Sequence, residues 1–526
     1  MLQAGTSDAV AHPRLLTDAG SIWAALSRTH GASVVVEVRL VRLTWLLERA
    51  TKRQHLPRRA DMEADSGSDG IDPFISPQEL RELPRGFDGQ LPILAVQAVM
   101  TTAESFSGQW LMTLAATIEE LQTCEAAFQR FPAEAGVFIE WCSLPQPDKK
   151  TGRRTVDEQA AFAAAVSSLH LWYSHSLTTV VLHGGGVAAE QAGRRGSQTQ
   201  QAATVVERSS FPPCAEAMTD GWFAFGRGLS AIRNGVTSSP MCGFLSWPQF
   251  VEVGVPNAVA SRRPPPPPSH FGAFLDTKAW PGGEANARLA TDLYGQALAS
   301  HLCGLLELRL VDEDWTDDEV TAVAALLPLC PRVTHLTVNV ELLSEQGYAA
   351  LGAALNAGAL PALEYLSIGQ HILSIEALPL LEALRGGEGE GAGGAQGGSG
   401  GGGLPNLRVL NLFGMLIDDA PLNVLAQALG ASALPALEDV QIWTQKSGAA
   451  GVMALVEQLR QGAAPKLRFV DMSGETTKPA EGGRRSSKFG ASDHKSAGKG
   501  PVEAMRRACG ERGVEFALSN ATSYKI

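Results

Sequence analysis

The chain has 526 residues, of which 44% are hydrophobic and 19% charged, a composition typical of globular proteins. At roughly 150 residues per domain, this length predicts about two to four domains. The formal net charge of −12 argues against a general nucleic-acid binder, because such proteins neutralise phosphates with a basic face.

Targeting and metal signals are missing from the sequence. Seven cysteines are present and no two form a C-x-x-C pair, which indicates neither a disulfide framework nor a zinc site. We find no apolar run of about 18 residues and no signal-peptide pattern. We therefore expect a cytoplasmic protein that binds no membrane, cofactor or metal.

The N-terminal half begins with residues 1–84, whose fold the sequence leaves uncertain, although ASVVVEVRLVRLTWLLERA is β-rich and then helical. In residues 85–256, strands alternate with helices. LPILAVQAV precedes LMTLAATIEELQTCEAAFQRF, GVFIEWCSL precedes TVDEQAAFAAAVSSLHLWYSH, and LTTVVLHG follows as the next strand. This alternation predicts a parallel sheet with crossover helices.

The stretch GVFIEWCSLPQPDKKTGRRTVDEQAAF spans residues 136–162 and predicts a buried strand, a loop and a capped helix. Pro145 and Pro147 are expected to end the strand, because proline lacks the N–H that a strand ladder requires. Thr155 and Glu158 form a T-x-x-E capping box that satisfies free N–H groups at the helix start.

The same stretch offers candidate chemistry. Glu140 lies at the carboxyl end of a predicted parallel strand, where such sheets bind ligands, and is the candidate catalytic carboxylate. Cys142 is expected to be a buried, inert thiol. A basic cluster beside the helix N-terminus is a candidate anion site, with a solvated loop as the alternative because no glycine-rich phosphate motif is present. Its members are Lys149, Lys150, Arg153 and Arg154.

A Pro-rich segment, residues 257–272, contains SRRPPPPPSH and is predicted to be a linker. Consecutive prolines favour a stiff polyproline II rod, which acts as a spacer or docks a module with an aromatic groove.

Residues 273–526 contain six segments of the pattern L-x-x-L-x-L, which start at residues 305, 333, 363, 407, 437 and 467. The spacing is 28 to 30 residues, except for one of 44 that holds a Gly-rich insertion, residues 386–403, which we expect to loop out. Helical patterns lie between the segments. The period predicts a leucine-rich-repeat α/β solenoid and resembles the ribonuclease-inhibitor-like class. A polar, basic insertion at residues 475–500 is expected to be disordered.

The predicted strands define a surface. Positions one, four and six of each segment should point inward, and the intervening residues should point outward onto a concave sheet. Exposed aromatic residues on such a face are candidate anchors for a protein partner, and the alternative is that they pack on one another. The candidate partner-binding residues are Arg309, His335, Tyr365, Asn411, Phe413, Asp439, Gln441, Trp443, Phe469 and Asp471.

One feature departs from ordinary leucine-rich repeats. Such repeats usually carry Asn or Cys three residues after the last apolar strand position, which stabilises the turn. The corresponding positions here hold Glu313, Glu341, His371, Met415, Gln445 and Glu475. Regular curvature is therefore not expected.

Several segments together carry a family resemblance. VFIEWCSLPQ, RRTVDEQAAF, LHLWYSHSLTTVVL and FLDTKAWPGGEANARLATDLY resemble an uncharacterised family from unicellular eukaryotes that joins this domain to leucine-rich repeats. The similarity covers residues 88–526. It implies an N-terminal domain similar in outline to Toll/interleukin-receptor (TIR) domains, which have a flavodoxin-like fold.

The resemblance also bears on catalysis. TIR-like enzymes cleave NAD with a helical glutamate, and this family usually shows R-G-W-x-x-F-E. Here Trp222 and Phe225 match that motif, Gly226 replaces the glutamate and Asp220 replaces the arginine. The resemblance therefore implies a pseudo-enzyme or an assembly module, because the carboxylate that stabilises the ribosyl cation is missing.

We therefore expect a non-enzymatic interaction or signalling scaffold, whose repeats bind a protein partner on the concave face and whose α/β domain self-associates. The alternative is a TIR-like enzyme that cleaves NAD or binds a nucleotide through Glu140 and the basic loop.

Overall fold

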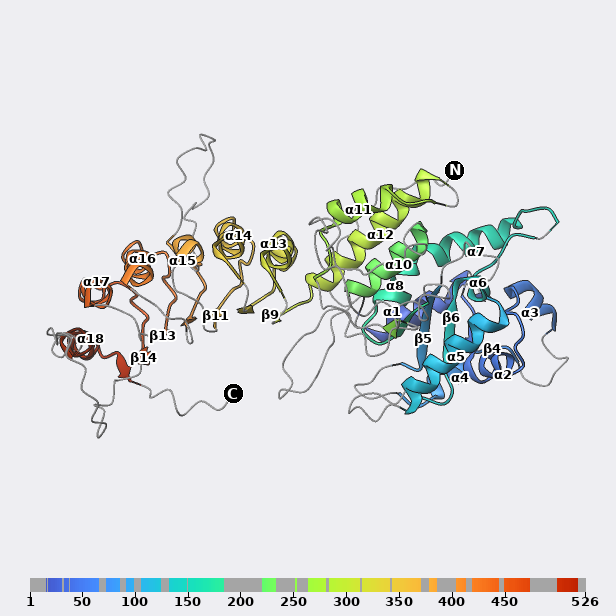
Figure 1. The fold of residues 1–526 in the computed structure, drawn as a ribbon, viewed down its shortest axis with the longest axis horizontal. Coiled ribbons are helices and arrows are strands. Elements are labelled where there is room, and N and C mark those ends of the chain that lie inside the picture. Colours follow the sequence, from blue (N-terminus) through green and yellow to red (C-terminus); the bar gives the residue numbers. More distant parts are fainter. Residues whose placement is uncertain are drawn as a thin grey trace, which may run out of the picture. The chain divides into compact units, whose positions relative to one another are not determined.

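The computed structural model contains two compact units, Met1–Leu302 and Cys303–Ile526 (Figure 1). The structure describes residues 16, 18–30, 33–36, 38–65, 72–85, 91–98, 106–123, 132–148, 150–183, 220–232, 251–252, 264–280, 283–312, 315–340, 343–369, 378–385, 404–412, 419–443, 449–473 and 499–518. Both units combine strands with helices, which confirms the predicted α/β class.

Six strands form the main sheet of the first unit, in the order β4-β3-β6-β5-β7-β8. They are β3 (Leu40–Arg42), β4 (Phe74–Ile75), β5 (Ile93–Ala98), β6 (Gly136–Ile139), β7 (Thr179–His183) and β8 (Val251–Glu252). β6, β5, β7 and β8 run parallel, as predicted, whereas β3 is antiparallel to both β4 and β6. Every residue of β5 and β6 is buried, because helices cover both faces.

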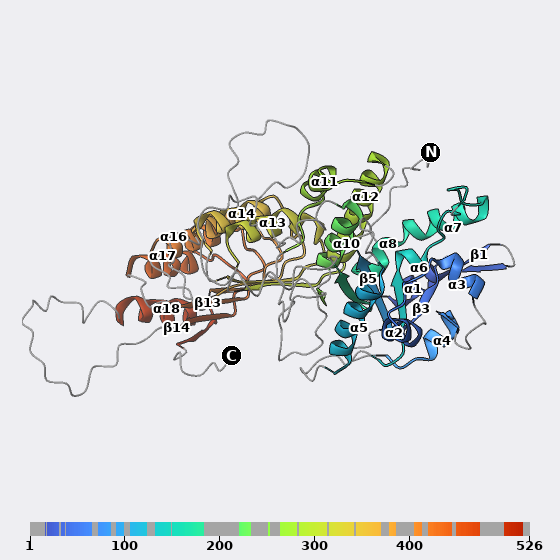
Figure 2. The ribbon, with the colours of Figure 1, turned by 45° about the vertical axis from the view of Figure 1, so that its right-hand side comes forward.

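The covering helices form two groups (Figure 1, Figure 2). On one side, α2 (Leu43–Thr51) and α5 (Gly108–Thr123) pack against each other and share a core with Leu94 and Val96 of β5. On the other side, α8 (Leu169–Ser174) and α10 (Gly221–Ile232) contact β5, and α12 (Glu284–Leu302) packs on both helices. The remaining elements are α1 (Ala19–Leu26), the antiparallel pair β1 (Ser27–His30) and β2 (Ser33–Val36), α3 (Arg59–Asp65), α4 (Pro77–Glu82), α6 (Glu140–Ser143), α7 (Val156–Ser167) and α11 (Pro268–Asp276).

The predicted strand GVFIEWCSL is shorter than expected. It ends at Ile139, and residues Glu140–Ser143 form the helical turn α6. The Ser143 hydroxyl accepts the Ile139 N–H at 3.0 Å, so this turn ends the strand before either proline is reached. The predicted helix after the loop is also interrupted, because Ser168 separates α7 from α8.

The boundaries of the first unit differ from those predicted. Residues 1–84, whose fold was left open, supply β3 and β4 to the same sheet. The described part of the predicted linker 257–272, residues 264–272, is not a free rod, because Pro264, Pro265 and Pro267 are buried and Pro268 begins α11. Proline is favoured in the first helical turn, where its missing N–H costs no hydrogen bond. α11 and α12 then pack on α10, so this unit continues to Leu302.

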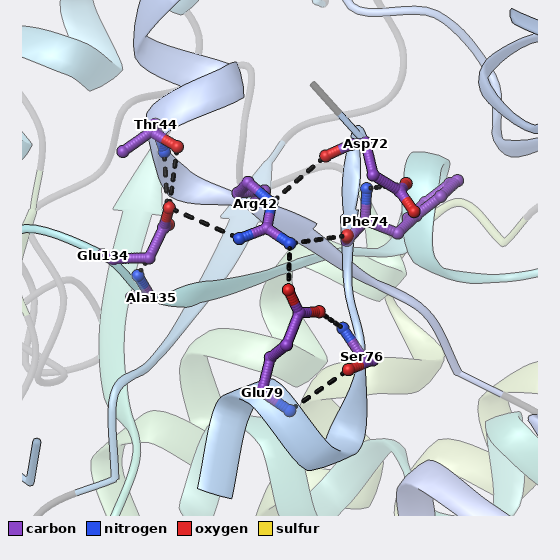
Figure 3. Close-up of polar contacts among 8 residues, drawn as sticks. All are labelled: Arg42, Thr44, Asp72, Phe74, Ser76, Glu79, Glu134 and Ala135. Carbon is purple, nitrogen blue, oxygen red and sulfur yellow. Dashed lines mark hydrogen bonds and ion pairs between the residues drawn. The ribbon is translucent and has the colours of Figure 1, made fainter. Parts of the chain in front are cut away.

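Arg42 joins the antiparallel edge of the sheet (Figure 3). Its Nη2 donates to Glu79 Oε1 at 2.9 Å, its Nε donates to the Asp72 carbonyl at 3.2 Å, and its Nη1 lies 3.7 Å from Glu134 Oε2. Glu79 also accepts the Ser76 N–H at 2.9 Å in a capping box that starts α4. These hydrogen bonds with Ser76, and then Arg42, lower the pKa of Glu79 to about 2.

The second unit repeats one strand and one helix along the chain. Its seven strands are all parallel and are ordered as in the sequence. They are β9 (Glu307–Asp312), β10 (His335–Val340), β11 (Tyr365–Ile368), β12 (Val409–Leu412), β13 (Asp439–Trp443), β14 (Phe469–Ser473) and β15 (Glu515–Ala517). The first six coincide with the six predicted segments, and β15 is an additional strand.

Six helices connect these strands, and consecutive helices pack on one another along one side of the sheet (Figure 1). They are α13 (Asp317–Leu326, followed by the 3₁₀ turn Leu327–Leu329), α14 (Glu345–Asn356), α15 (Leu378–Leu384), α16 (Asp419–Gly430), α17 (Ala449–Arg460) and α18 (Lys499–Glu511). Side chains link neighbouring repeats: Asp419 Oδ1 accepts the Gly451 N–H at 2.8 Å, and Arg408 pairs with Glu438 at 3.1 Å.

The predicted alternation of side chains is confirmed in the described strands except at Asp471, an intervening position of β14 that is only 4% exposed. Positions four and six of the six segments are buried, for example Leu366 and Ile368 in β11. The intervening positions of β10 to β12 are half-buried or exposed. The sheet therefore has one face against the helices and a second face, here called the open face, that carries the intervening side chains. The six positions expected to hold a turn-stabilising Asn or Cys lie outside the described residues.

Candidate functional site

The first candidate site surrounds Glu140, which opens α6 directly after β6. Glu140 is partly buried, and its Oε1 accepts a hydrogen bond from the Tyr173 hydroxyl at 2.9 Å. Burial raises the pKa of Glu140 to about 7, Tyr173 opposes this shift, and the neighbouring Asp220 carboxylate adds to it. A carboxyl group that titrates near neutral pH at the end of a parallel strand can accept or donate a proton under physiological conditions.

Asp220 is the second carboxylate of this site and is only 2% exposed. Its Oδ1 accepts the N–H groups of Trp222 at 2.8 Å and Phe223 at 3.2 Å, so it stabilises the start of α10. Its Oδ2 is shielded from solvent and accepts no hydrogen bond from a described residue. The N-terminus of α10 thus holds a negative charge close enough to Glu140 to disfavour a second one.

Gln97 occupies the space in which the TIR-like resemblance expects a glutamate side chain. Its Nε2 donates to the Trp222 carbonyl at 3.2 Å, and the whole residue is 1% exposed. A Cβ added at Gly226 would lie 2.5 Å from Gln97 Cδ, which is shorter than any ordinary contact. The Gln97 amide and a glutamate at position 226 therefore exclude each other in this packing.

Trp141 and Cys142 serve packing. Cys142 is fully buried, its Sγ donates to the Pro57 carbonyl at 3.2 Å, and burial raises the pKa of its thiol well above the usual range. Trp141 stacks on Phe106 at 5.4 Å between ring centroids, and its Nε1 donates to the Leu56 carbonyl. The thiol is therefore buried, as expected, and such surroundings disfavour the reactive thiolate.

The structure describes three of the four residues of the predicted basic loop. Lys150 and Arg153 are exposed, and Lys149 lies outside the described residues. Arg154 instead donates to the Pro145 carbonyl at 2.8 Å and lies 3.6 Å from the centroid of the Phe162 ring. The Thr155 capping box is confirmed, and it places the Glu158 carboxylate at the helix start, where an anion would otherwise bind. Anion binding at this loop stays a prediction.

The second candidate site is the open face of the seven-stranded sheet. Parallel register places Glu307, His335, Tyr365, Val409, Asp439, Phe469 and Glu515 in one row across the strands. A second row contains Arg309, Thr337, Ser367, Asn411, Gln441, Asp471 and Ala517. The structure thus brings eight of the predicted partner-binding residues onto one surface. Phe413 and the side chain of Trp443 lie outside the described part.

Some residues of the open face contact each other. The rings of His335 and Tyr365 stack with centroids 5.4 Å apart, and Asn411 Nδ2 donates to the Tyr365 hydroxyl at 3.4 Å. This is the self-packing that the sequence left as an alternative. His335 is nevertheless exposed and Tyr365 half-buried, so both retain surface for a partner.

Sequence reasoning did not assign Tyr173, Gln97 or Asp220 to a site. Tyr173 lies 33 positions from Glu140, and only the fold brings them together. Asp220 could have been found as a helix start, because it precedes an apolar helical run and Asp is a preferred N-cap residue. Nothing in the local sequence marks Gln97, which sits inside an apolar strand.

Comparisons with known proteins add no assignment: no protein-family model matches this sequence, and no curated protein is significantly similar to it. Within the described ranges, no group of three or more His, Cys, Asp or Glu side chains is arranged to hold a metal ion. No described helix combines the length and apolar character needed to cross a membrane.

Proposed function

We propose that this protein is a non-enzymatic interaction scaffold whose second unit binds a protein partner on the open face of its sheet. The supporting observation is the alternation of the strands, which buries one set of side chains under the helices and leaves aromatic and polar side chains on the other face. Repeating strand–helix units with a continuous exposed sheet are typical binding surfaces. We assign the unit to the leucine-rich-repeat solenoids on the same grounds.

Substitution of open-face aromatics tests this proposal. Tyr365→Ala with Phe469→Ala removes two half-buried side chains of the face, and the same test applies to Phe413 and Trp443. A matched control is Met453→Ala on α17, which removes a 40% exposed apolar side chain from the helical side. In the full chain, the open-face variant should no longer capture the partner from a cell lysate, whereas the control variant should capture it as the wild type does. Equal capture by both variants contradicts the proposal.

A second candidate function is proton-transfer chemistry at Glu140 on NAD or a related nucleotide, the substrate class that the TIR-like resemblance implies. The observation that favours it is the Glu140–Tyr173 hydrogen bond at 2.9 Å, on a carboxyl whose pKa is raised to about 7. The test is nicotinamide release from NAD by the full chain, with Glu140→Gln and Tyr173→Phe as controls. Release that persists in Glu140→Gln excludes this role.

The cellular setting belongs to the same proposal. We propose a cytoplasmic protein whose first unit self-associates, as the resemblance to signalling domains implies. Analytical ultracentrifugation of residues 1–302 and of the full chain measures self-association. Purely monomeric species in both samples would contradict it.

A further inference from the structure

The open face changes in charge along the sheet. On β9, Arg309 Nε donates to Glu307 Oε1 at 2.6 Å, so the two charges there compensate each other. On β13, β14 and β15, the outward positions hold Asp439, Asp471 and Glu515, and none of them holds Lys or Arg. Asp439 and Glu515 therefore present carboxylates at one end of the face, here called the acidic end, and Asp471 between them is only 4% exposed and adds a buried acid.

Asp439 has unused acceptor capacity. Its Oδ2 accepts one hydrogen bond, from Gln441 Nε2 at 3.4 Å, and its Oδ1 is shielded from solvent and accepts none from a described residue. Burial, and then the neighbouring Asp471, raise the pKa of Asp439, which Gln441 opposes. A cation placed here would compensate a carboxylate that its surroundings disfavour.

An aromatic ring lies between the carboxylates. Parallel register pairs Asp439 with Phe469, and Phe469 with Glu515, so the half-buried Phe469 stands between two acids in the same row. A guanidinium group is planar, stacks on aromatic rings and donates in its plane to carboxylates on either side. An ammonium group is a compact, strongly hydrated point charge without a planar fork, so it matches this arrangement less well.

We propose that the acidic end binds arginine side chains of a protein partner. This inference rests on the proposed function of the open face and specifies the partner's chemistry.

The test uses the full chain and fluorescein-labelled peptides of four arginines, four lysines or four citrullines, with affinity measured by fluorescence anisotropy. The arginine peptide should bind most tightly and the citrulline peptide should not bind. Asp439→Asn should weaken arginine binding by about tenfold, as loss of a charged hydrogen bond does. Glu515→Gln should weaken it in the same direction. Phe469→Leu should reduce the preference for arginine over lysine.

The control is Glu503→Gln, which removes the same charge from α18 on the helical side and should leave affinity unchanged. Equal binding of arginine and lysine peptides, or equal loss with Glu503→Gln, overturns the proposal. The double variant Arg484→Gln with Arg485→Gln tests whether this chain's own basic segment occupies the acidic end. If that variant binds the peptide more tightly, the occupant is this segment, and the proposal of a partner's arginines is overturned. If the arginine peptide does not bind but open-face substitutions still abolish partner capture, only the arginine assignment is wrong. If those substitutions leave partner capture unchanged, the proposed function is wrong too.

Discussion

At the scale of single residues, Glu140 makes stability depend on pH. The folded chain holds the Glu140 proton more tightly than the unfolded chain, because the pKa of this carboxyl rises from 4.5 to about 7 on folding. The contribution of the protonated carboxyl to the free energy of unfolding is fully present below pH 4.5 and is lost as the pH rises through about 7. Glu140→Gln keeps the acceptor for Tyr173 and, as an amide, does not ionise. Its free energy of unfolding should therefore be roughly 2–3 kcal/mol higher than that of the wild type at pH 8.

Urea unfolding at pH 4 and pH 8 measures this difference, which should vanish at the lower pH. Glu82→Gln on the exposed side of α4 is the matched control and should show no such dependence. A Glu140→Gln effect of equal size at both pH values would show that the carboxyl does not titrate in this range.

Glu79 acts in the opposite direction, because its pKa is lowered from 4.5 to about 2. Its contribution is complete above pH 4.5 and is lost as the pH falls through about 2. Since its side chain is 50% exposed, solvent screens the pair with Arg42, and Glu79→Gln should cost less than about 1 kcal/mol at pH 7. Thermal unfolding should show this small difference at pH 7 and none at pH 2. A difference that grows in acid would contradict the assignment.

At the scale of elements, α10 depends on the fit between Gly226 and Gln97. Gly226→Ala gains about 1 kcal/mol of helix propensity, but its Cβ would overlap the buried Gln97 amide, a clash worth about 1–3 kcal/mol. We expect net destabilisation in Gly226→Ala and its relief in the double variant Gln97→Ala with Gly226→Ala. Denaturant unfolding of the four proteins in this cycle measures the coupling. Additive effects would show that the two residues do not compete for space.

The helices of the second unit are joined at their N-terminal ends. Asp419 at the start of α16 accepts the Gly451 N–H at the start of α17, and a charged acceptor is favourable at a helix N-terminus. Asp419→Ala should cost about 0.5–2 kcal/mol, the range for loss of a helix cap. Hydrogen exchange should show faster exchange at the start of α17 than at α14. Uniform acceleration, or none, would contradict a local role.

At the scale of the whole molecule, the sequence predicted the elements that repeat at a regular period, but it did not predict single contacts between residues far apart in the chain. Each of the first six strands of the second unit begins two residues after the start of a predicted segment, for example Tyr365 after residue 363. β15 was missed because three residues carry too little periodicity. β3 lies within the run that was predicted to be β-rich, but its antiparallel pairing was not predicted, and β4 was missed because it is short and pairs with a distant partner. Glu140 was identifiable from its place after a strand, whereas Tyr173 and Asp220 join it only through packing.

The first unit was predicted to end before the Pro-rich segment but extends to Leu302. Runs of proline usually indicate an exposed spacer, and the sequence does not show when such a run is buried by other parts of the fold. Here the Tyr294 hydroxyl of α12 donates to the Pro266 carbonyl at 2.6 Å, and Pro264, Pro265 and Pro267 are buried. Composition alone does not reveal such a covering helix.

The most direct measurement of the central claim is site-specific photo-cross-linking in cells. A benzophenone amino acid replaces Phe469 on the open face in one sample and Met453 on α17 in another. Binding on the open face predicts a discrete cross-linked protein species from position 469 and none from position 453. Cross-links of equal yield from both positions, or from position 453 alone, would contradict a partner-binding face on this sheet.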